Sequence, residues 1–140
     1  MRRIMMRSKI HRATVTAASV DYEGSISIDR SLMAAVDIFP YEQVHVLDIN
    51  NGSRLITYAI PGESGEICLN GAAAKMVDVG DLVIIISYGE FAAGELESFQ
   101  PLVARVDENN RMLSLERLPC GHPDMFTSDI IDVYRPGTGS

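Results

Sequence analysis

The chain has 140 residues, of which 46% are hydrophobic and 22% charged, and its formal net charge is −7. This length fits one domain, and because tryptophan is absent and aromatic residues are few, we expect a core of aliphatic side chains. The acidic balance opposes binding to nucleic acid, and the apolar run at 82–87 is far shorter than the roughly 20 residues of a membrane-spanning helix. We therefore expect no nucleic-acid partner and no membrane partner.

The cysteines and the N-terminus predict a cytoplasmic protein. Cys68 and Cys120 lie far apart and form no CxxC or Cys-His pattern, so buried or incidental thiols are favoured over a metal site. Residues 1–12 interleave charges with apolar side chains, which argues against a signal peptide. The basic side chains near this end fit either a solvated strand edge or a site for an anionic small molecule, and composition leaves both open: Arg2, Arg3, Arg7, Lys9, His11 and Arg12.

The first third of the chain predicts two strands and a short helix. Residues 9–20 are rich in β-branched side chains with partial alternation, which indicates the first strand. An extended segment follows at 25–29. Asp29 or Ser31 can cap a helix through 31–38, which Pro40 prevents from continuing.

Two hairpins are predicted from alternating runs that flank turn residues. The clearer one spans 42–60 and turns at Asn51-Gly52, a pair that tolerates the positive φ angles of a type I′ turn. The other spans 101–117 and turns at 108–110. In the second strand of the first hairpin, period-two alternation puts Arg54 and Tyr58 on one face and Thr57 on the other. A twist or bulge would be needed for Thr57 and Tyr58 to share a site.

Between the hairpins, a strand ends at a sharp Asn70-Gly71 turn and runs into an alanine-rich helical turn. A further turn at Gly80-Asp81 leads into the buried strand at 82–87. The small residues at 71–74 allow backbone to approach either packed protein, which is the more common case, or a ligand held by free N–H groups.

Many short strands, tight turns, little helix and no βαβ rhythm predict a mainly β fold, a small closed or nearly closed β-barrel. We expect it to occupy residues 1–117. Prolines and glycines interrupt the sequence beyond this point, so we expect 118–140 to be a mobile tail with one docked piece at 129–134.

Five segments carry a resemblance to a known family: KIHRATVT at 9–16, YEGSISID at 22–29, NNGSRLITYAI at 50–60, NGAAA at 70–74 and VGDLVIIIS at 79–87. In their order and approximate spacing they resemble the pyruvoyl-dependent aspartate decarboxylases, bacterial enzymes that make β-alanine for pantothenate and coenzyme A. The segment at 100–110 matches only loosely, and the chain from 118 does not match. The resemblance implies a six-stranded double-ψ β-barrel with short helices, assembled as a homotetramer whose active sites lie between neighbouring subunits.

The resemblance gives Gly24-Ser25 a second interpretation beside the ordinary turn that local sequence favours. In the family the precursor cleaves itself at this bond, and the serine becomes a pyruvoyl group that forms a Schiff base with the substrate. This group is the only cofactor implied, with no metal and no pyridoxal phosphate. A β-hydroxyl can attack the preceding carbonyl and turn the amide into an ester, and glycine at the preceding position removes a crowding Cβ.

The resemblance also implies the roles of other residues. Thr57 would assist self-processing and contact the substrate, and Tyr58 would be the proton donor. Arg54, together with Lys9 from a neighbouring subunit, would bind the retained carboxylate, because a guanidinium fork meets a carboxylate with two parallel hydrogen bonds. The pyruvoyl amide and the substrate would be held by Asn70, Gly71, Ala72 and Ala73. Weaker candidates are His11 as a cation, Tyr22 as a lining residue and 84–86 as an apolar wall.

Without the resemblance, Lys9 and Arg54 fit surface charges on strands, and Thr57 fits an ordinary strand residue. We expect decarboxylation of L-aspartate to β-alanine and carbon dioxide, with a maturation factor as a further partner in some relatives. Two alternatives stay open: a β-barrel binding module without catalysis, and a pyruvoyl-dependent decarboxylase of another acidic amino acid such as glutamate. One methylene is worth only about 1–3 kcal/mol, so sequence does not set this preference.

Overall fold

The structure is a computed structural model that describes residues 1–125, and it confirms a mainly β fold with a few short helices. The strands are β1 (Arg2–Thr14), β2 (Ala17–Ser19), β3 (Ser25–Asp29), β4 (Gln43–Asp48), β5 (Arg54–Gly62), β6 (Ile67–Asn70), β7 (Leu82–Ala92), β8 (Leu102–Val106) and β9 (Met112–Arg117). The helices are α1 (Arg30–Ala35) and the 3₁₀ turns η1 (Gly71–Met76), η2 (Ala93–Glu97) and η3 (Pro123–Met125). Over this range, no helix has the length and apolar character needed to cross a membrane. The docked piece expected at 129–134 lies outside the described residues.

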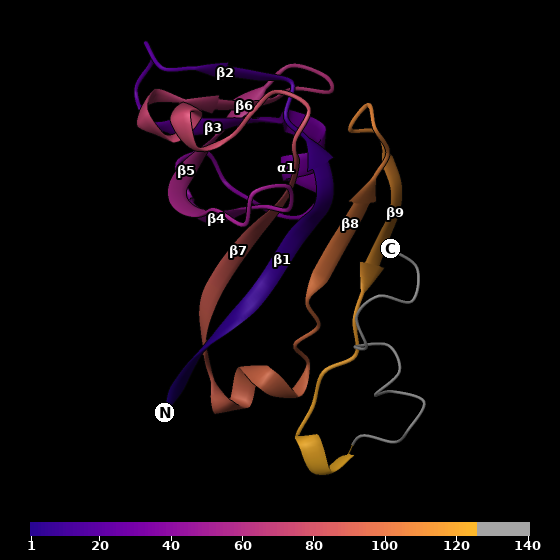
Figure 1. Ribbon diagram of the computed structural model, residues 1–140. Helices are drawn as coiled ribbons and strands as arrows, with labels where there is room; N and C mark the ends of the chain where they lie inside the picture. Colours follow the sequence, from indigo (N-terminus) through magenta and orange to yellow (C-terminus); the bar gives the residue numbers. More distant parts are fainter. Residues whose placement is uncertain (126–140) are drawn as a thin grey trace.

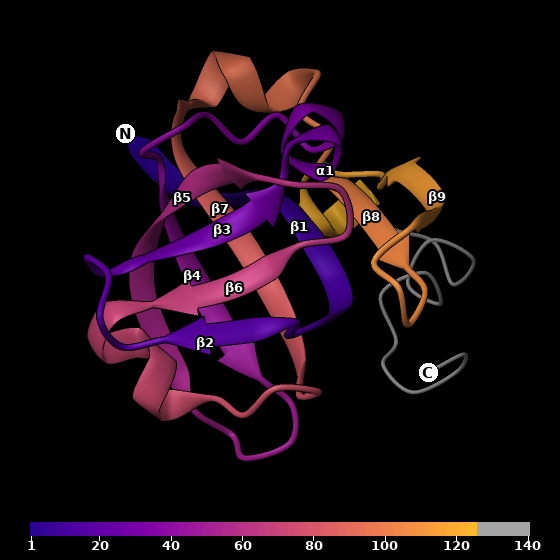
Figure 2. The ribbon, with the colours of Figure 1, turned by 90° about the horizontal axis from the view of Figure 1, so that it is seen from above.

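The strands form one sheet in the order β2-β6-β3-β5-β4-β7-β1-β8-β9. Only Val15 and Thr16 separate β1 from β2, yet β1 pairs with β7 whereas β2 pairs with β6. The continuous segment that holds β1 and β2 therefore borders the set β6-β3-β5-β4-β7 on both sides, so that these seven strands curl around a common core. Figure 2 shows the result, with β3, β6 and β2 lying across β4, β7 and β1.

The core between these layers is aliphatic, as the composition predicted. The largest fully buried side chains are Ile10, Ile26, Ile28, Ile67, Leu69, Ile85, Val15, Val36, Val44, Val46, Val83 and Val103. In β3 the isoleucines alternate with serines, so the core takes one face of the strand and leaves its hydroxyls on the other.

The first strand was predicted at 9–20, and these boundaries are wrong. β1 begins at Arg2 because it pairs with β7 along most of its length, and this tertiary pairing outweighs the weak strand propensity of a charged segment. The strand is then interrupted at Val15 and Thr16, whose N–H groups donate to Asp81 O at 2.9 Å and Ile67 O at 2.8 Å. Figure 1 shows β1 and β7 as a long twisted pair, with the β8–β9 hairpin beside β1.

Both predicted hairpins are present, but the turn of the first is not type I′. Gly52 has a φ of 77°, whereas Asn51 does not have the positive φ that a type I′ turn requires. The loop is wider because the Asp48 carboxylate accepts hydrogen bonds from Asn50 N at 2.8 Å and Asn51 N at 3.2 Å. The side chain of the last β4 residue thus organises the connection.

The helix begins at its predicted cap and ends earlier than predicted. Asp29 Oδ1 accepts hydrogen bonds from Ser31 N at 2.8 Å and Leu32 N at 3.4 Å. The helix was expected to continue through 31–38, but it ends at Ala35, and Asp37 has a φ of 57° that a right-handed helix does not accommodate. The prediction of the cap is confirmed, and the predicted end is wrong.

Candidate active site

The Gly24-Ser25 bond lies where β3 begins. Ser25 is opposite Asn70 in the antiparallel β3–β6 ladder, and both side chains are buried. Asn70 Nδ2 donates to Ser25 Oγ at 2.9 Å, and the same hydroxyl donates to Glu23 O at 3.3 Å. The Ser25 hydroxyl, which the resemblance predicts to be the nucleophile, therefore accepts one hydrogen bond and donates another.

Gly71 packs directly against the backbone before Ser25. Its φ is 69°, and a Cβ added to it would lie 2.7 Å from both the Cα and the N of Gly24 and 2.9 Å from Tyr22 O. A Cβ added to Gly24 would meet no atom within 4 Å outside its chain neighbours. The packing within the chain therefore requires glycine at 71 and does not require it at 24.

A hollow of about 430 Å³ opens beside Gly24. Its lining brings together five of the predicted site residues, with three apolar neighbours that the sequence did not indicate: Gly24, Thr57, Tyr58, Ala72 and Ala73, with Leu55, Ile56 and Met76. The volume is in the range of small-molecule sites. The lining is mostly apolar, which favours reactions that require weak solvation of charge.

Thr57 and Tyr58 share this hollow although they are neighbours on a strand. The β4–β5 ladder runs through both without a register shift, so no bulge is responsible. The parallel β3–β5 ladder starts only at Ile26 and Ala59. Before Ala59 the β3-facing edge of β5 is therefore unpaired, and side chains from both faces of the strand can flank it. The hollow lies along this open edge.

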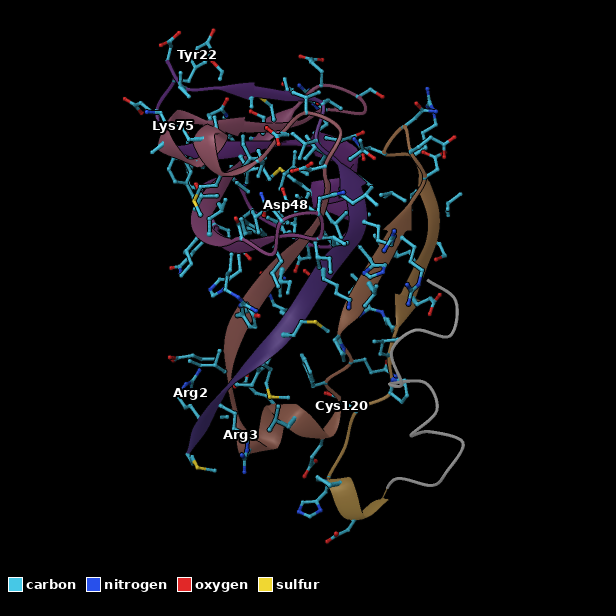
Figure 3. All side chains as sticks on the ribbon, in the orientation of Figure 1. Arg2, Arg3, Tyr22, Asp48, Lys75 and Cys120 are labelled. Carbon is cyan, nitrogen blue, oxygen red and sulfur yellow. The ribbon has the colours of Figure 1, made fainter. Side chains whose placement is uncertain are left out.

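The predicted cations are not in the hollow. Arg54 is exposed at the start of β5, with Nη1 3.3 Å from His45 Nδ1. Lys9 lies on β1, opposite Ile86 of β7 and Val103 of β8. The lining of the hollow within residues 1–125 contains no charged side chain. Tyr22 is 71% exposed and is not among the residues that line the hollow. Figure 3 shows its side chain at one end of the molecule.

Lys9 lies in a strongly cationic part of the molecule. Burial, and then the charge of Arg105, lower its pKa. Burial also lowers the pKa of His11 to about 4, with further contributions from Lys9, Arg105 and Arg12. His11 is therefore neutral at pH 7 in the single chain, and it does not serve there as the additional cation that we considered.

Two polar residues near Ser25, Ser27 and Cys68, were not predicted as site residues from the sequence. Asn70 Nδ2 also donates to Ser27 Oγ at 3.1 Å, and Cys68 Sγ donates to Asn70 Oδ1 at 3.3 Å. Period-two spacing could have suggested both, because Ser27 is two residues from Ser25 and Cys68 is two residues from Asn70. The pairing of β3 with β6, which joins the two sets, has no signal in the local sequence.

The polar side chains at the site are hydroxyls, an amide and a thiol. Across residues 1–125 no three His, Cys, Asp or Glu side chains are grouped so that they could hold a metal ion. The site offers instead a buried hydroxyl, an amide donor and an apolar hollow. A buried serine hydroxyl held by a donor and an acceptor is a candidate nucleophile.

Comparison with known proteins shows the family of this chain. Residues 1–113 match the model of the aspartate decarboxylase family. The aspartate 1-decarboxylase of Moorella thermoacetica is 56% identical over 119 residues, which are 84% of this chain and 93% of the relative. That of Thermoanaerobacter pseudethanolicus is 55% identical over 117 residues, 82% of this chain and 100% of the relative. That of Acetivibrio thermocellus is 57% identical over 114 residues, 80% of this chain and 90% of the relative. The chain therefore belongs to the aspartate decarboxylase family.

Proposed function

We propose that this chain decarboxylates L-aspartate to β-alanine and carbon dioxide, for pantothenate and coenzyme A biosynthesis, after cleaving its own Gly24-Ser25 bond. Membership of the family supports the reaction. The observation that carries the cleavage is the hydrogen bond of 2.9 Å from Asn70 Nδ2 to the buried Ser25 Oγ, beside a hollow that Gly24, Thr57 and Tyr58 line.

Ser25 starts the cleavage. Its Oγ attacks the carbonyl carbon of Gly24, so that the amide becomes an ester and the nitrogen of residue 25 becomes a free amine. Thr57 donates a hydrogen bond to the Gly24 oxygen as negative charge develops there. Loss of the Cα proton and of the ester oxygen leaves a carboxylate on Gly24. The dehydroalanine that remains takes up water and releases ammonia, which gives the pyruvoyl terminus.

The pyruvoyl group supplies a carbonyl that condenses with the substrate amine and accepts the electrons left by the departing carbon dioxide. Asn70 and the backbone N–H groups of Gly71, Ala72 and Ala73 hold the group and the substrate. Tyr58 returns a proton to the former α-carbon. The mostly apolar lining keeps the departing carboxylate weakly solvated.

The retained carboxylate needs a cation, and we assign this role to Arg54 and to Lys9 of a neighbouring subunit. The uncharged lining of the hollow in one chain supports a site that a second subunit completes. A homotetramer with sites between subunits satisfies this requirement. Exchange of either cation for alanine is expected to raise KM for aspartate more than it lowers kcat, because each binds a carboxylate that does not react.

Intact mass spectrometry of purified protein after prolonged incubation tests the proposal. We expect two pieces, 1–24 and 25–140, with the larger piece carrying the mass change of ammonia loss. Ser25→Ala should remain one inactive chain, while Ser114→Ala on β9 should cleave like the wild type. Cleavage of the Ser25→Ala variant would overturn the mechanism, and a wild-type chain that stays intact would favour the binding module.

The identity of the amino acid is tested separately. Carbon dioxide release from aspartate and from glutamate is compared at equal concentration. We expect faster release from aspartate. Faster release from glutamate would show that glutamate is the preferred substrate.

A further inference from the structure

Four buried polar side chains form a connected set on the β3–β6 ladder. Ser25 and Ser27 belong to β3, and Cys68 and Asn70 belong to β6, with Ser25 opposite Asn70 and Ser27 opposite Cys68. Because side chains alternate along a strand, all four lie on one face while the residues between them face the core. Their exposure is 9% or less. Such a set is stable only when its members satisfy one another.

Asn70 is the centre of this set. Its Nδ2 donates to Ser25 Oγ at 2.9 Å and to Ser27 Oγ at 3.1 Å, and its Oδ1 accepts from Cys68 Sγ at 3.3 Å. A half-turn of the amide would aim Oδ1 at the serines and Nδ2 at sulfur, which is a weak acceptor. The reversed amide would also compete with Glu23 O for the Ser25 proton. The observed orientation is therefore the favourable one.

We propose that Ser27 and Cys68 are positioning residues for maturation: they hold the Asn70 amide in the orientation that aims an N–H at Ser25 Oγ. This inference rests on the proposed self-cleavage. When the Cβ–Oγ bond of the ester breaks, the Cα proton passes to water, a Cα–Cβ double bond forms, and the electron pair of the broken bond stays on Oγ within the Gly24 carboxylate. An N–H aimed at Oγ stabilises that charge.

The protonation state of Cys68 is consistent with this role. Burial, and then the charge of Glu66, raise the pKa of the Cys68 thiol. The side chain therefore keeps its S–H at pH 7, as a donor to Asn70 Oδ1 must. A thiolate at this position would repel the amide oxygen and favour the reversed orientation.

Cleavage kinetics test the proposal. Cys68→Ala and Ser27→Ala each remove one partner of Asn70, and each should slow the appearance of the 25–140 piece by about two- to tenfold, the value of one hydrogen bond. Cys68→Ser keeps a donor and should cleave at close to the wild-type rate. Cys120→Ala is the matched control, since this half-buried thiol makes no hydrogen bond to the site. Wild-type rates in both alanine variants would overturn the proposal.

A second background separates positioning from general structural damage. In Asn70→Ala, the further change Cys68→Ala should have no added effect on cleavage, because its influence passes through the amide that is already absent. Additive slowing would overturn the proposal.

Hydrogen exchange of the Asn70 side-chain amide, measured by NMR, does not depend on cleavage. It should be faster in Cys68→Ala than in the wild type, and unchanged exchange would count against positioning. If the wild type never cleaved, the proposed function would fail, and this exchange would decide the positioning role alone.

Discussion

Asp48 is a buried carboxyl group with one oxygen that lacks a donor. Its Oδ1 accepts from two backbone N–H groups of the β4–β5 loop, while Oδ2 is buried without a hydrogen-bond partner, and the residue is only 2% exposed. Figure 3 labels Asp48. The neighbouring group is the carboxyl of Asp81. Two carboxylates cannot bond each other unless one carries a proton. Burial, and then the neighbouring Asp81 side chain, raise the pKa of Asp48, whereas the Asp48 side chain lowers the pKa of Asp81.

Asp48→Asn should therefore stabilise the protein at neutral and alkaline pH. Because the pKa of Asp48 is raised in the folded protein, its contribution to the free energy of unfolding is complete only at pH values below the ordinary pKa of an aspartate. This contribution is lost as pH rises through the raised pKa. An asparagine Nδ2 donates to Asp81 at every pH. We expect a gain of about 1 kcal/mol in the free energy of unfolding at pH 8, shrinking as the pH falls toward about 4.

Urea unfolding across this pH range measures the effect. Asp78→Asn, at an exposed position three residues before Asp81, serves as the control and should show no such pH dependence. A destabilised Asp48→Asn variant at pH 8 would contradict the shared proton.

Gly71→Ala should be the most damaging single-methyl change near the site. Alanine pays about 1–2 kcal/mol for a left-handed backbone conformation, and its Cβ would also push against the backbone of Gly24. Gly52→Ala separates the two costs, since Gly52 has a φ of 77° and open space around it. We expect Gly71→Ala to lose more stability than Gly52→Ala and to slow cleavage. Equal losses in urea unfolding would show that the contact with Gly24 is unimportant.

At the scale of elements, Asp29 ties the start of α1 to the loop before β6. Its Oδ1 caps the helix, and its Oδ2 accepts from Gly65 N at 2.8 Å. Burial raises the pKa of Asp29, but the hydrogen bonds from Gly65, Ser31 and Leu32 together outweigh it, so the pKa lies below its ordinary value. One carboxylate thus connects segments that are 36 residues apart.

Asp29→Ala should cost about 1–3 kcal/mol of unfolding free energy at pH 7, since it removes the cap and leaves Gly65 N without its acceptor. Because the pKa of Asp29 is lowered in the folded protein, the ionised side chain stabilises the fold at pH values above the ordinary pKa of an aspartate. This stabilisation is lost as pH falls through the lowered pKa. The difference from the wild type should therefore shrink in acid. Ser31→Ala removes only one of the bonds and should cost less. A loss that stays constant from pH 7 to about pH 3 would argue against an ionised cap.

Elements that depend on nearby residues were predictable from the sequence. The Asp29 cap and both hairpins have signals within a few residues, and the structure has them where the sequence placed them. The start of β1 was not predictable, because it depends on pairing with β7 about 80 residues later. The prediction of a type I′ turn at Asn51-Gly52 was wrong for a related reason, since hydrogen bonds to the Asp48 carboxylate widen the loop.

The same division holds for the candidate site. Gly24, Thr57, Tyr58 and the alanines of η1 could be nominated from motifs, and one hollow brings them together. Thr57 and Tyr58 both line the hollow because the ladder between β3 and β5 begins only after them. The alternation of side chains along one strand carries no information about where that ladder begins. The Ser27–Asn70–Cys68 set likewise requires the register between β3 and β6. The roles of Lys9 and Arg54 stay predictions.

At the scale of the whole molecule, the segment that cleavage would release is built into the sheet. β1 pairs with both β7 and β8, and β2 pairs with β6. Ile10, Ala13 and Val15 of this segment are 1% exposed or less. Cleavage after Gly24 breaks the covalent connection between residues 1–24 and the rest of the chain. It leaves the strand pairing and the core contacts of β1 and β2 unchanged, because these do not involve that bond.

The two pieces should therefore remain together after cleavage. Burial of these apolar side chains and the three ladders oppose release, since each buried aliphatic side chain is worth about 1.5–3 kcal/mol. We expect size-exclusion chromatography of the incubated protein to give one peak that holds both 1–24 and 25–140, and a denaturing gel to separate them. The uncleaved Ser25→Ala chain should elute at the same volume, because the fold does not depend on the bond. A peak that contains 25–140 without 1–24 would mean that β1 is held by its covalent connection, and the ladders that join both sides of the curled sheet would then be too weak to retain it.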